Sequence, residues 1–433
     1  MYITLNKVAN CLRCIFSLII LFWSNFIVAD EKTDANPNIV LIVADYMGYA
    51  DIGPYGALDI QTPALDTLAA QGVRFSNYYS SAPKCIPARA SLMSGLYPAK
   101  ALTRFTSEKG LGLPSEKNTL LSELKAAGYA TAAVGKWHLG TEQNFNPTDH
   151  GFDSFFGFHS WTLGYHNHLT SDGEPGLYRN DDLVREDGYL TDLFTNEGLN
   201  FIDKSAGKPF FLYLAYNTAL PPYQGPNLPE SKWDSGWEVN KASRADYVAM
   251  VEAMDQGINK VLNKLQEQGL AENTLVIFTY DHGGRHLINN EPLFHGFSTL
   301  WEGGIRVPMI IRWPRNIKGG GLVETPAIAM DLTASMLDAA DRDNAISALD
   351  GISLFPVINA PEKATQRQLF WRHGKMKAIR QGSWKYVIDG HTQLLINLDA
   401  DISERKNLYY KHPKIAKQLR ESLANWEQSL NLK

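Results

Sequence analysis

Residues 38–44 read NIVLIVA, an almost wholly apolar run that is rich in β-branched side chains. A strand with one face in water alternates polar and apolar residues, so a run without alternation predicts a strand buried on both faces of a parallel sheet. Three similar runs follow, at residues 130–134, 209–215 and 274–279. We therefore expect a sheet whose two faces are both covered.

Segments with helical periodicity lie between these runs, at residues 64–71, 119–127 and 247–268. Strands that alternate with helices predict an α/β fold with a doubly wound, mostly parallel sheet flanked by helices. In such a sheet, ligands bind beyond the carboxyl ends of the strands. The residues that follow the four runs are Asp45, the segment 135–138, Tyr216 with Asn217, and the segment 281–284.

The pattern of apolar residues changes near Leu369, where short segments of alternating polar and apolar residues replace the long apolar runs. They are followed by an amphipathic helical pattern that begins at Pro413. The 433 residues therefore divide into a predicted catalytic domain, residues 30–365, and a small C-terminal α+β subdomain, residues 366–433. We expect this subdomain to consist of an antiparallel sheet and a helix.

The N-terminal segment, residues 1–29, has the layout of a signal peptide. Lys7 and Arg13 precede an apolar run, residues 15–28, that ends on the small residue Ala29. The alternative is a membrane anchor, but the run is shorter than the ~20 residues that a spanning helix needs. We therefore expect export to the periplasm or the medium of a bacterium, with no integral membrane span after the signal is removed.

The composition of the chain argues against nucleic acid as a partner and favours a bacterial periplasm. The chain has 41 Lys and Arg against 46 Asp and Glu and no long basic run, so it lacks the charge pattern of a nucleic-acid-binding protein. Of 3 cysteines, Cys85 alone follows the predicted leader, so the exported protein would have no intramolecular disulfide. No Asn-x-Ser/Thr acceptor has a non-proline middle residue, which favours a bacterial periplasm over a secretory pathway.

Cys85 lies in the segment PKCIPARASLMSG, residues 83–95. Pro87 suits the first turn of a helix and would place Cys85 just before the helix N-terminus, where partial positive charge activates a nucleophile. On residue type alone, a buried small hydrophobe is an equal alternative. The pattern C-x-P-x-R followed by A-S-L-x-S-G-x-Y-P, however, resembles the signature of the type I, formylglycine-dependent sulfatases of the alkaline phosphatase superfamily.

Further motifs of that family occur in the family's order. They are VAD at residues 43–45, GYAD at 48–51, GKWHLG at 135–140, HGFD at 150–153, YDHGG at 280–284, WEGGIRVP at 301–308, and a tail, LINLDADISERKNL at 395–408, that looks like the family's C-terminal hairpin. The resemblance runs from about residue 38 to the end of the chain. It implies an arylsulfatase-like sulfuric ester hydrolase in which a formylglycine-generating enzyme oxidises Cys85 before folding.

The resemblance also implies one divalent cation, Ca²⁺ or Mg²⁺, held by Asp45, Asp281, His282 and the formylglycine oxygen from Cys85. Carboxylate oxygens at the ends of two parallel strands are hard ligands that suit these ions. Taken singly, each aspartate is more often a turn or capping residue, and their joint placement beside the Cys85 segment makes them candidate ligands. His282 stands where many family members have Asn.

Three more residues carry over from the family. Arg89 would steady the formylglycine and the neighbouring carboxylates. Lys136 and His138 are two residues apart after a strand, so their side chains can point together into the crevice. Lys136 would hold a sulfate oxygen, and His138 would act as the base that expels sulfate after its transfer.

Three positions depart from the family pattern. Tyr46 replaces a second metal aspartate, which leaves the cation fewer anionic ligands. Leu220 stands where a histidine protonates the leaving alcohol, and Phe297 stands where a lysine reaches the sulfate. His286 and His295, in the loop after the YDHGG motif, are candidate replacements that would bind the substrate.

We therefore expect an exported sulfatase that cleaves sulfate esters, on a sulfated small molecule or a sulfated carbohydrate or polysaccharide, through a nucleophile derived from Cys85. One alternative is a catalytically impaired family member that binds sulfated glycans without turnover, which the three departures favour. Another is a phosphoric-ester hydrolase that uses unmodified Cys85, against which the intact C-x-P-x-R pattern argues.

Overall fold

The computed structural model describes residues 36–102, 112–117, 119–140, 145–205, 207–360 and 366–430. The predicted leader, residues 1–29, lies outside these ranges. The described residues form one compact unit. Within the described ranges, no helix is both long and apolar enough to cross a membrane.

In the described part of the chain, a ten-stranded sheet forms the core, with the strand order β11-β2-β10-β9-β1-β8-β4-β5-β6-β7. The strands are β1 (Asn38–Ala44), β2 (Val73–Phe75), β4 (Ala130–Lys136), β5 (Ser154–Phe158), β6 (Tyr178–Arg179), β7 (Asp182–Leu183), β8 (Phe210–Ala215), β9 (Thr274–Tyr280), β10 (Met309–Arg312) and β11 (Gly321–Val323). The central strands β9, β1, β8 and β4 are parallel and correspond to the four apolar runs. All of β1 is buried, as a strand covered on both faces requires.

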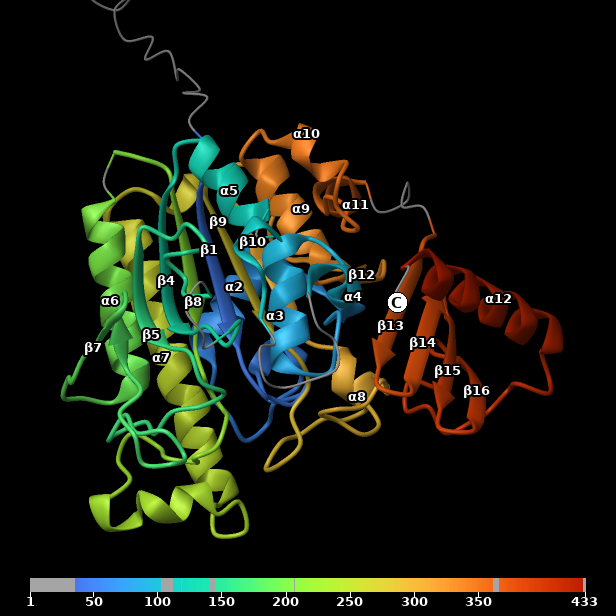
Figure 1. The fold of residues 1–433 in the computed structure, drawn as a ribbon, viewed down its shortest axis with the longest axis horizontal. Coiled ribbons are helices and arrows are strands. Elements are labelled where there is room, and N and C mark those ends of the chain that lie inside the picture. Colours follow the sequence, from blue (N-terminus) through green and yellow to red (C-terminus); the bar gives the residue numbers. More distant parts are fainter. Residues whose placement is uncertain are drawn as a thin grey trace, which may run out of the picture. The chain divides into compact units, whose positions relative to one another are not determined.

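Helices cover both faces of this sheet (Figure 1). Helices α6 (Leu190–Lys204) and α7 (Arg244–Glu267) lie on one face, and α3 (Cys85–Ser94), α5 (Thr119–Ala126) and α9 (Met330–Ala339) lie on the other. The remaining elements are α2 (Pro63–Gln71), which packs on α7, the short helices α4 (Pro98–Ala101), α8 (Glu302–Ile305), α10 (Asp343–Ile346) and α11 (Phe355–Asn359), and a two-stranded ladder of β3 (Tyr78–Tyr79) and β12 (Ala327–Ile328). This arrangement confirms the doubly wound α/β fold.

The register of the central strands brings their carboxyl ends to one edge of the sheet. Val43 on β1 pairs with Ala215 on β8, which in turn pairs with Gly135 on β4. Gly135 has a φ of 104°, and a Cβ there would lie 2.0 Å from the carbonyl oxygen of Ala215, so no larger residue fits at this close approach. The residues that follow these strands therefore lie side by side.

The sequence does not predict the short strands at one side of the sheet. Strands β2, β10 and β11 have three or four residues each, too few to show a periodicity. Strand β10 runs antiparallel to β9, which makes the sheet mixed at this side. Strand β4 extends two residues beyond the predicted run, to Lys136, and so carries that side chain to the carboxyl edge.

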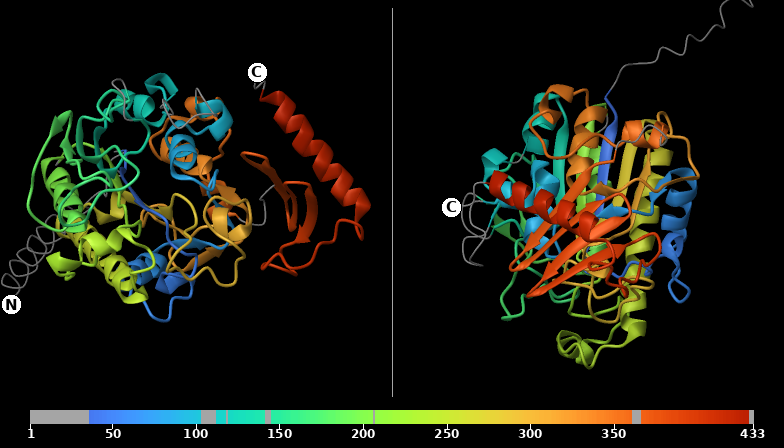
Figure 2. Two further views of the ribbon diagram at one scale, coloured as in Figure 1. Left: turned by 60° about the horizontal axis from the view of Figure 1, so that its bottom comes forward. Right: turned by 90° about the vertical axis from the view of Figure 1, so that its right-hand side faces the viewer.

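A four-stranded antiparallel sheet with a helix follows (Figure 2). Its strands, in order, are β13 (Gln368–His373), β14 (Met376–Gln381), β15 (Trp384–Asp389) and β16 (Thr392–Asn397), and helix α12 (Pro413–Ser429) packs on one face. Leu419 and Leu423 of α12 are buried, and Trp426 stacks on Phe370 of β13 with ring centroids 5.0 Å apart. The tail motif does not form the expected hairpin, because β16 ends at Asn397 and a loop follows.

A buried ionic cluster joins this second sheet to the first. Lys385 of β15 donates hydrogen bonds to Oε1 of Glu302 in α8, at 2.8 Å, and to Oε1 of Glu404, at 2.9 Å. Oε2 of Glu404 also accepts a hydrogen bond from the backbone N–H of Glu302, at 2.6 Å. All three side chains are buried, and we call them the docking cluster. Glu404, in the loop after β16, thus contacts both Lys385 of the second sheet and Glu302 of α8.

The docking cluster has one more neighbour, since the hydroxyl of Tyr79 in β3 donates to Oε2 of Glu302, at 2.6 Å. A separate chain of hydrogen bonds connects the second sheet with the carboxyl edge of the first. The indole N–H of Trp371, on β13, donates to the carbonyl oxygen of Ser80, at 2.8 Å, and the hydroxyl of Ser80 donates to the carbonyl oxygen of Asp281. The second sheet therefore supports the backbone of a predicted metal ligand.

Candidate active site

Cys85 is the first residue of α3, and not the residue before the helix as the sequence predicts. Pro87 is then the third residue, where its missing N–H costs nothing, because the first four N–H groups of a helix have no partner within it. The Cys85 side chain is buried, with Sγ 3.0 Å from Nε2 of His282 and 3.4 Å from Nζ of Lys136. A helix N-terminus and a cationic side chain both face this sulfur, so positive charge surrounds it.

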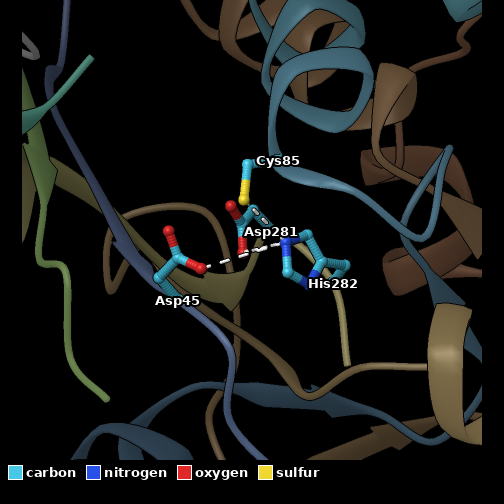
Figure 3. A group of neighbouring side chains, drawn as sticks. All are labelled: Asp45, Cys85, Asp281 and His282. Atoms are coloured by element: carbon cyan, nitrogen blue, oxygen red, sulfur yellow. Dashed lines mark hydrogen bonds and ion pairs between the residues drawn. The ribbon is translucent and has the colours of Figure 1, made fainter. Parts of the chain in front are cut away.

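Asp45 and Asp281 follow the neighbouring strands β1 and β9, and the backbone N–H of Asp281 donates to the carbonyl oxygen of Ala44, at 3.1 Å. His282 comes next in the chain. One ligand atom from each of Asp45, Cys85, Asp281 and His282 lies within 4.8 Å of the other three (Figure 3). We call these four residues the ligand cluster. The residues predicted to hold a cation therefore meet at one point.

Arg89 of α3 is fully buried and contacts both carboxylates. Its Nη2 lies 2.9 Å from Oδ2 of Asp45, and its Nε lies 3.0 Å from Oδ2 of Asp281. Nη1 donates to the carbonyl oxygen of Lys136, at 2.9 Å, and to the hydroxyl of Tyr213, at 3.0 Å. One guanidinium group therefore ties four central strands together.

Lys136 is the last residue of β4, and His138 follows two residues later; both lie close to the charged groups of the site. Nζ of Lys136 donates to Oδ2 of Asp45, at 2.6 Å. Burial raises the pKa of Asp45, but the positive charges of Lys136 and Arg89 outweigh it, so the pKa of this carboxyl is lowered. His138 has a left-handed backbone, with a φ of 55°. Burial, together with the charges of Lys136 and Arg89, holds the pKa of His138 well below 6.5, which leaves a neutral imidazole that can accept a proton.

The ligand cluster has the chemistry of a divalent-cation site. Oδ1 of Asp45 and Oδ1 of Asp281 are buried and accept no hydrogen bond from any described residue, a costly state unless a ligand satisfies them. Nδ1 of His282 lies 3.1 Å from the carbonyl oxygen of Gly283, so Nε2 is the ring atom that faces the carboxylates. Burial lowers the pKa of His282, but the negative charges of Asp281 and Cys85 raise it more, to about 10, so this point attracts positive charge. These donors fit a divalent cation.

The three departures from the family pattern contribute no charge to the site. The ring of Tyr46 lies 5.0 Å from that of Phe297 and 6.2 Å from that of His282, centroid to centroid. Burial raises the pKa of Tyr46 to about 12, so the phenol is neutral at pH 7. Leu220 is 2% exposed and carries no group that could protonate an alcohol.

The candidate replacements His286 and His295 lie in the loop after the ligand cluster. His295 is exposed and packs against the rings of Phe294 and Trp301, at 4.1 and 5.7 Å. His286 is partly exposed, and its carbonyl oxygen accepts a hydrogen bond from the hydroxyl of Tyr223, at 3.3 Å. Across the described ranges, no hydrogen bond or ion pair joins either imidazole to the ligand cluster. Their role in binding substrate stays a prediction.

Sequence reasoning misses two residues that support the site. Tyr213 carries the one hydroxyl in the buried strand FFLYLA and bonds Arg89. A buried phenol needs a hydrogen-bond partner, so this hydroxyl was a usable signal. Ser80, whose hydroxyl holds the carbonyl of Asp281, gives no such signal, because the two residues are far apart in the sequence.

A doubly wound sheet that brings a helix N-terminus and two strand-end carboxylates together at its carboxyl edge fits the hydrolases of the alkaline phosphatase superfamily. Within it, the profile of the sulfatase family matches residues 37–342, and that of the N-sulphoglucosamine sulphohydrolase C-terminal region matches residues 294–429. The chain belongs to the sulfatase family and is a sulfuric ester hydrolase.

Individual relatives agree with this assignment. N-acetylgalactosamine-6-sulfatase of Mus musculus is 32% identical over 380 residues, which cover 81% of this chain and 71% of the relative. An arylsulfatase of Hemicentrotus pulcherrimus is 32% identical over 378 residues, with 81% and 67% covered. The crystal structure of Ps i-CgsB in complex with k-i-k-neocarrahexaose is similar with a TM-score of 0.80 and 32% identity, covering 90% of this chain and 92% of that chain.

Proposed function

We propose that this sulfatase removes a sulfate ester from a carbohydrate, through a formylglycine formed from Cys85 and with Ca²⁺ or Mg²⁺ at the ligand cluster. The observation that carries the proposal is the position of Cys85 at the start of α3, with Sγ 3.0 Å from Nε2 of His282 and 3.4 Å from Nζ of Lys136. The names of the relatives support a carbohydrate substrate: one is an N-acetylgalactosamine-6-sulfatase, and another structure holds neocarrahexaose.

The side chains around Cys85 would each have a separate role in the reaction. When present, formylglycine supplies a hydrated aldehyde as the nucleophile, and the cation offsets negative charge. Lys136, which already bridges Asp45 and Cys85, would hold a sulfate oxygen as a point charge. Arg89 keeps the carboxylates in place. His138 is neutral and would accept a proton at a ring nitrogen.

The leaving alcohol needs a proton that Leu220 cannot supply. We assign this proton to His286 or His295, because the loop that carries both begins directly after the ligand cluster. The same loop returns to the segment that follows the cluster: the backbone N–H of Phe297 donates to the carbonyl oxygen of Gly284, at 2.8 Å.

We also propose that the protein is exported to the periplasm or secreted, on the strength of its signal-peptide-like leader. A formylglycine-generating enzyme would act on the chain before it folds, since Cys85 is only 8% exposed in the folded protein. A sulfated glycan or small molecule would then be the partner of the mature enzyme.

The test is to produce the protein together with a formylglycine-generating enzyme and to measure two quantities. One is the mass of the peptide that contains residue 85. The other is the inorganic sulfate released from a sulfated monosaccharide. We expect formylglycine at residue 85 and sulfate release that Cys85→Ala abolishes. Ser94→Ala, on the same helix, is the matched control, because Ser94 bonds only backbone groups. Sulfate release by the Cys85→Ala protein would disprove the proposed nucleophile.

The buried Leu220 favours a second candidate function, the binding of sulfated glycans without turnover. The two candidates differ in one measurement on protein that contains formylglycine and a cation. Binding of a sulfated oligosaccharide without release of sulfate would support the second candidate. Release of sulfate from the same oligosaccharide would exclude it.

A further inference from the structure

Three rings pack together on one side of the ligand cluster. The centroid of Phe297 lies 5.0 Å from that of Tyr46 and 5.1 Å from that of His282, and the Tyr46 ring meets the His282 ring edge-on at 88°. Tyr46 is only 7% exposed. We call Tyr46 and Phe297 the aromatic wall. The imidazole of His282 therefore has a ring neighbour from each of two other segments of the chain.

The backbone fixes these segments to one another. Gly284, two residues after His282, donates its N–H to the carbonyl oxygen of Met47, at 2.9 Å, and accepts the N–H of Phe297, at 2.8 Å. A Cβ on Gly284 would lie 2.1 Å from the carbonyl oxygen of Tyr46, so only glycine allows this approach. The wall and the histidine are thus held in place by main-chain contacts that do not depend on their side chains.

The wall keeps its place at a conformational cost. Tyr46 has a φ of 62°, and Ser298, next to Phe297, has a φ of 66°. Bulky residues rarely adopt this left-handed region, and such strain persists where the surrounding structure imposes it, most often at functional sites. This backbone strain indicates that the position of these rings serves a function besides packing.

The wall also accounts for two of the departures at once. The family pattern leads us to expect a carboxylate at residue 46 and a lysine at residue 297. Tyr46 and Phe297 touch, so replacing both removes one negative and one positive charge from the same spot. Compared with the family pattern, the local net charge is therefore the same, and His282 contacts two uncharged rings.

We propose that Tyr46 and Phe297 are positioning residues for His282. They fix the plane of the imidazole so that Nε2 faces Cys85 and the free Oδ1 of Asp45, at 3.0 and 3.9 Å. A nitrogen ligand held in one orientation would then face the cation site. This inference rests on the cation site of the proposed function. Hydrogen-bonding partners that orient a metal-bound histidine are worth about 10–100-fold in metal affinity, and we expect the lower end of this range for rings that orient it by packing.

The experiment measures cation affinity and ligand geometry on the full chain after treatment with a chelator. Ca²⁺ and Mn²⁺ are titrated separately by calorimetry, and the absorption spectrum with Co²⁺ reports the coordination of the imidazole. We expect Tyr46→Ala and Phe297→Ala to bind about 10-fold more weakly and to change the Co²⁺ spectrum. Tyr46→Phe keeps the ring and should bind as the parent does.

Two controls separate positioning from a merely structural role. Phe355→Ala removes a ring that packs on Trp313, 5.5 Å away and outside the ligand cluster, and should lower the melting temperature without changing cation affinity. If the alanine variants do not fold, Tyr46→Leu and Phe297→Leu keep most of the apolar volume but lose the ring, and the same loss of affinity is expected.

The possible outcomes are distinct. Unchanged affinity and an unchanged Co²⁺ spectrum in wall variants of a parent that binds cations would overturn the positioning role and leave the proposed function intact. A parent that binds no divalent cation would overturn the cation site of the proposed function, and the inference with it. A loss of affinity in the wall variants but not in Tyr46→Phe or Phe355→Ala supports the inference.

Discussion

Replacing Lys385 with methionine tests what holds the second sheet to the first. Nζ of Lys385 bonds Glu302 and Glu404 at 2.8 and 2.9 Å, and none of the three side chains is open to solvent. Burial raises the pKa of Glu404 to about 7; for Glu302, the charges of Lys385 and Arg306 outweigh burial and hold the pKa at about 2. Methionine matches the length of lysine but leaves the buried Glu404 without a cation and leaves Glu302 with only its pairing to Arg306, at 3.2 Å.

The expected loss of stability follows from this burial. Removing one partner of a buried ion pair costs about 3–5 kcal/mol, because the remaining charge stays buried without compensation. A chain of this length unfolds with an entropy of about 0.8 kcal/mol/K, so the melting temperature should fall by about 4–6 °C. The exposed pair Lys241–Glu238, with both side chains more than half in solvent (55% and 51%), is the matched control. Lys241→Met should cost less than about 1 kcal/mol.

Differential scanning calorimetry of the full chain at pH 7.5 measures both variants. A third variant combines Lys385→Met with Glu302→Gln and Glu404→Gln, which removes the two carboxylates and keeps hydrogen-bonding groups in their place. It should recover at least half of the lost melting temperature. A Lys385→Met protein that melts within about 1 °C of the parent, or a triple variant less stable than Lys385→Met alone, would refute the reasoning.

Three further results are expected. Ca²⁺ added to chelator-treated protein should raise the melting temperature, because a ligand that binds the folded state stabilises it, and Asp281→Ala should abolish the rise in the same thermal scan. If His286 or His295 protonates the leaving alcohol, replacing that histidine with Ala should lower the rate of hydrolysis of a sugar sulfate by about 10²–10⁴-fold. The same change should hardly affect an aryl sulfate, whose leaving group needs no acid. Equal losses of rate on both substrates would exclude that role. Burial lowers the pKa of His150 to about 4, below its value in the unfolded chain. The free energy of unfolding should therefore be highest above pH 6.5 and should decrease by up to about 3 kcal/mol as the pH falls toward 4, as measured by urea titration. His150→Gln should remove that part of the acid sensitivity.

The centre of the sheet was predictable because burial on both faces leaves a local mark in the sequence. The run at residues 38–44 coincides with β1, and the other three runs match their strands within two residues. Once the strands are placed, the rule that ligands bind at carboxyl ends selects Asp45 and Asp281. This part of the site therefore follows from short-range pattern and general topology.

Other features depend on contacts between distant segments, which no local pattern reports. Glu404, in the loop that the tail motif forms after β16, meets Lys385 of β15 and also Glu302 of α8, which lies 102 residues earlier in the chain. Likewise, Tyr46 and Phe297 look like two separate losses in the sequence, and only the folded chain shows that their rings touch. The start of α3 at Cys85 is a difference of one residue, within the usual uncertainty of helix ends.

The burial of Cys85 sets a time limit on the modification that we propose for it. Strand β9, which pairs with β1 and leads into Asp281, lies roughly 200 residues after Cys85, and at about 5–20 residues per second a ribosome needs about 10–40 s to make that length. Until β9 emerges, the central sheet lacks a strand and the Cys85 segment has no complete site to fold into. The oxidising enzyme of the proposed maturation would therefore meet an accessible thiol early in synthesis and a buried one after the later half of the chain has folded. The distance along the chain between Cys85 and Asp281 would then set the time available for the modification.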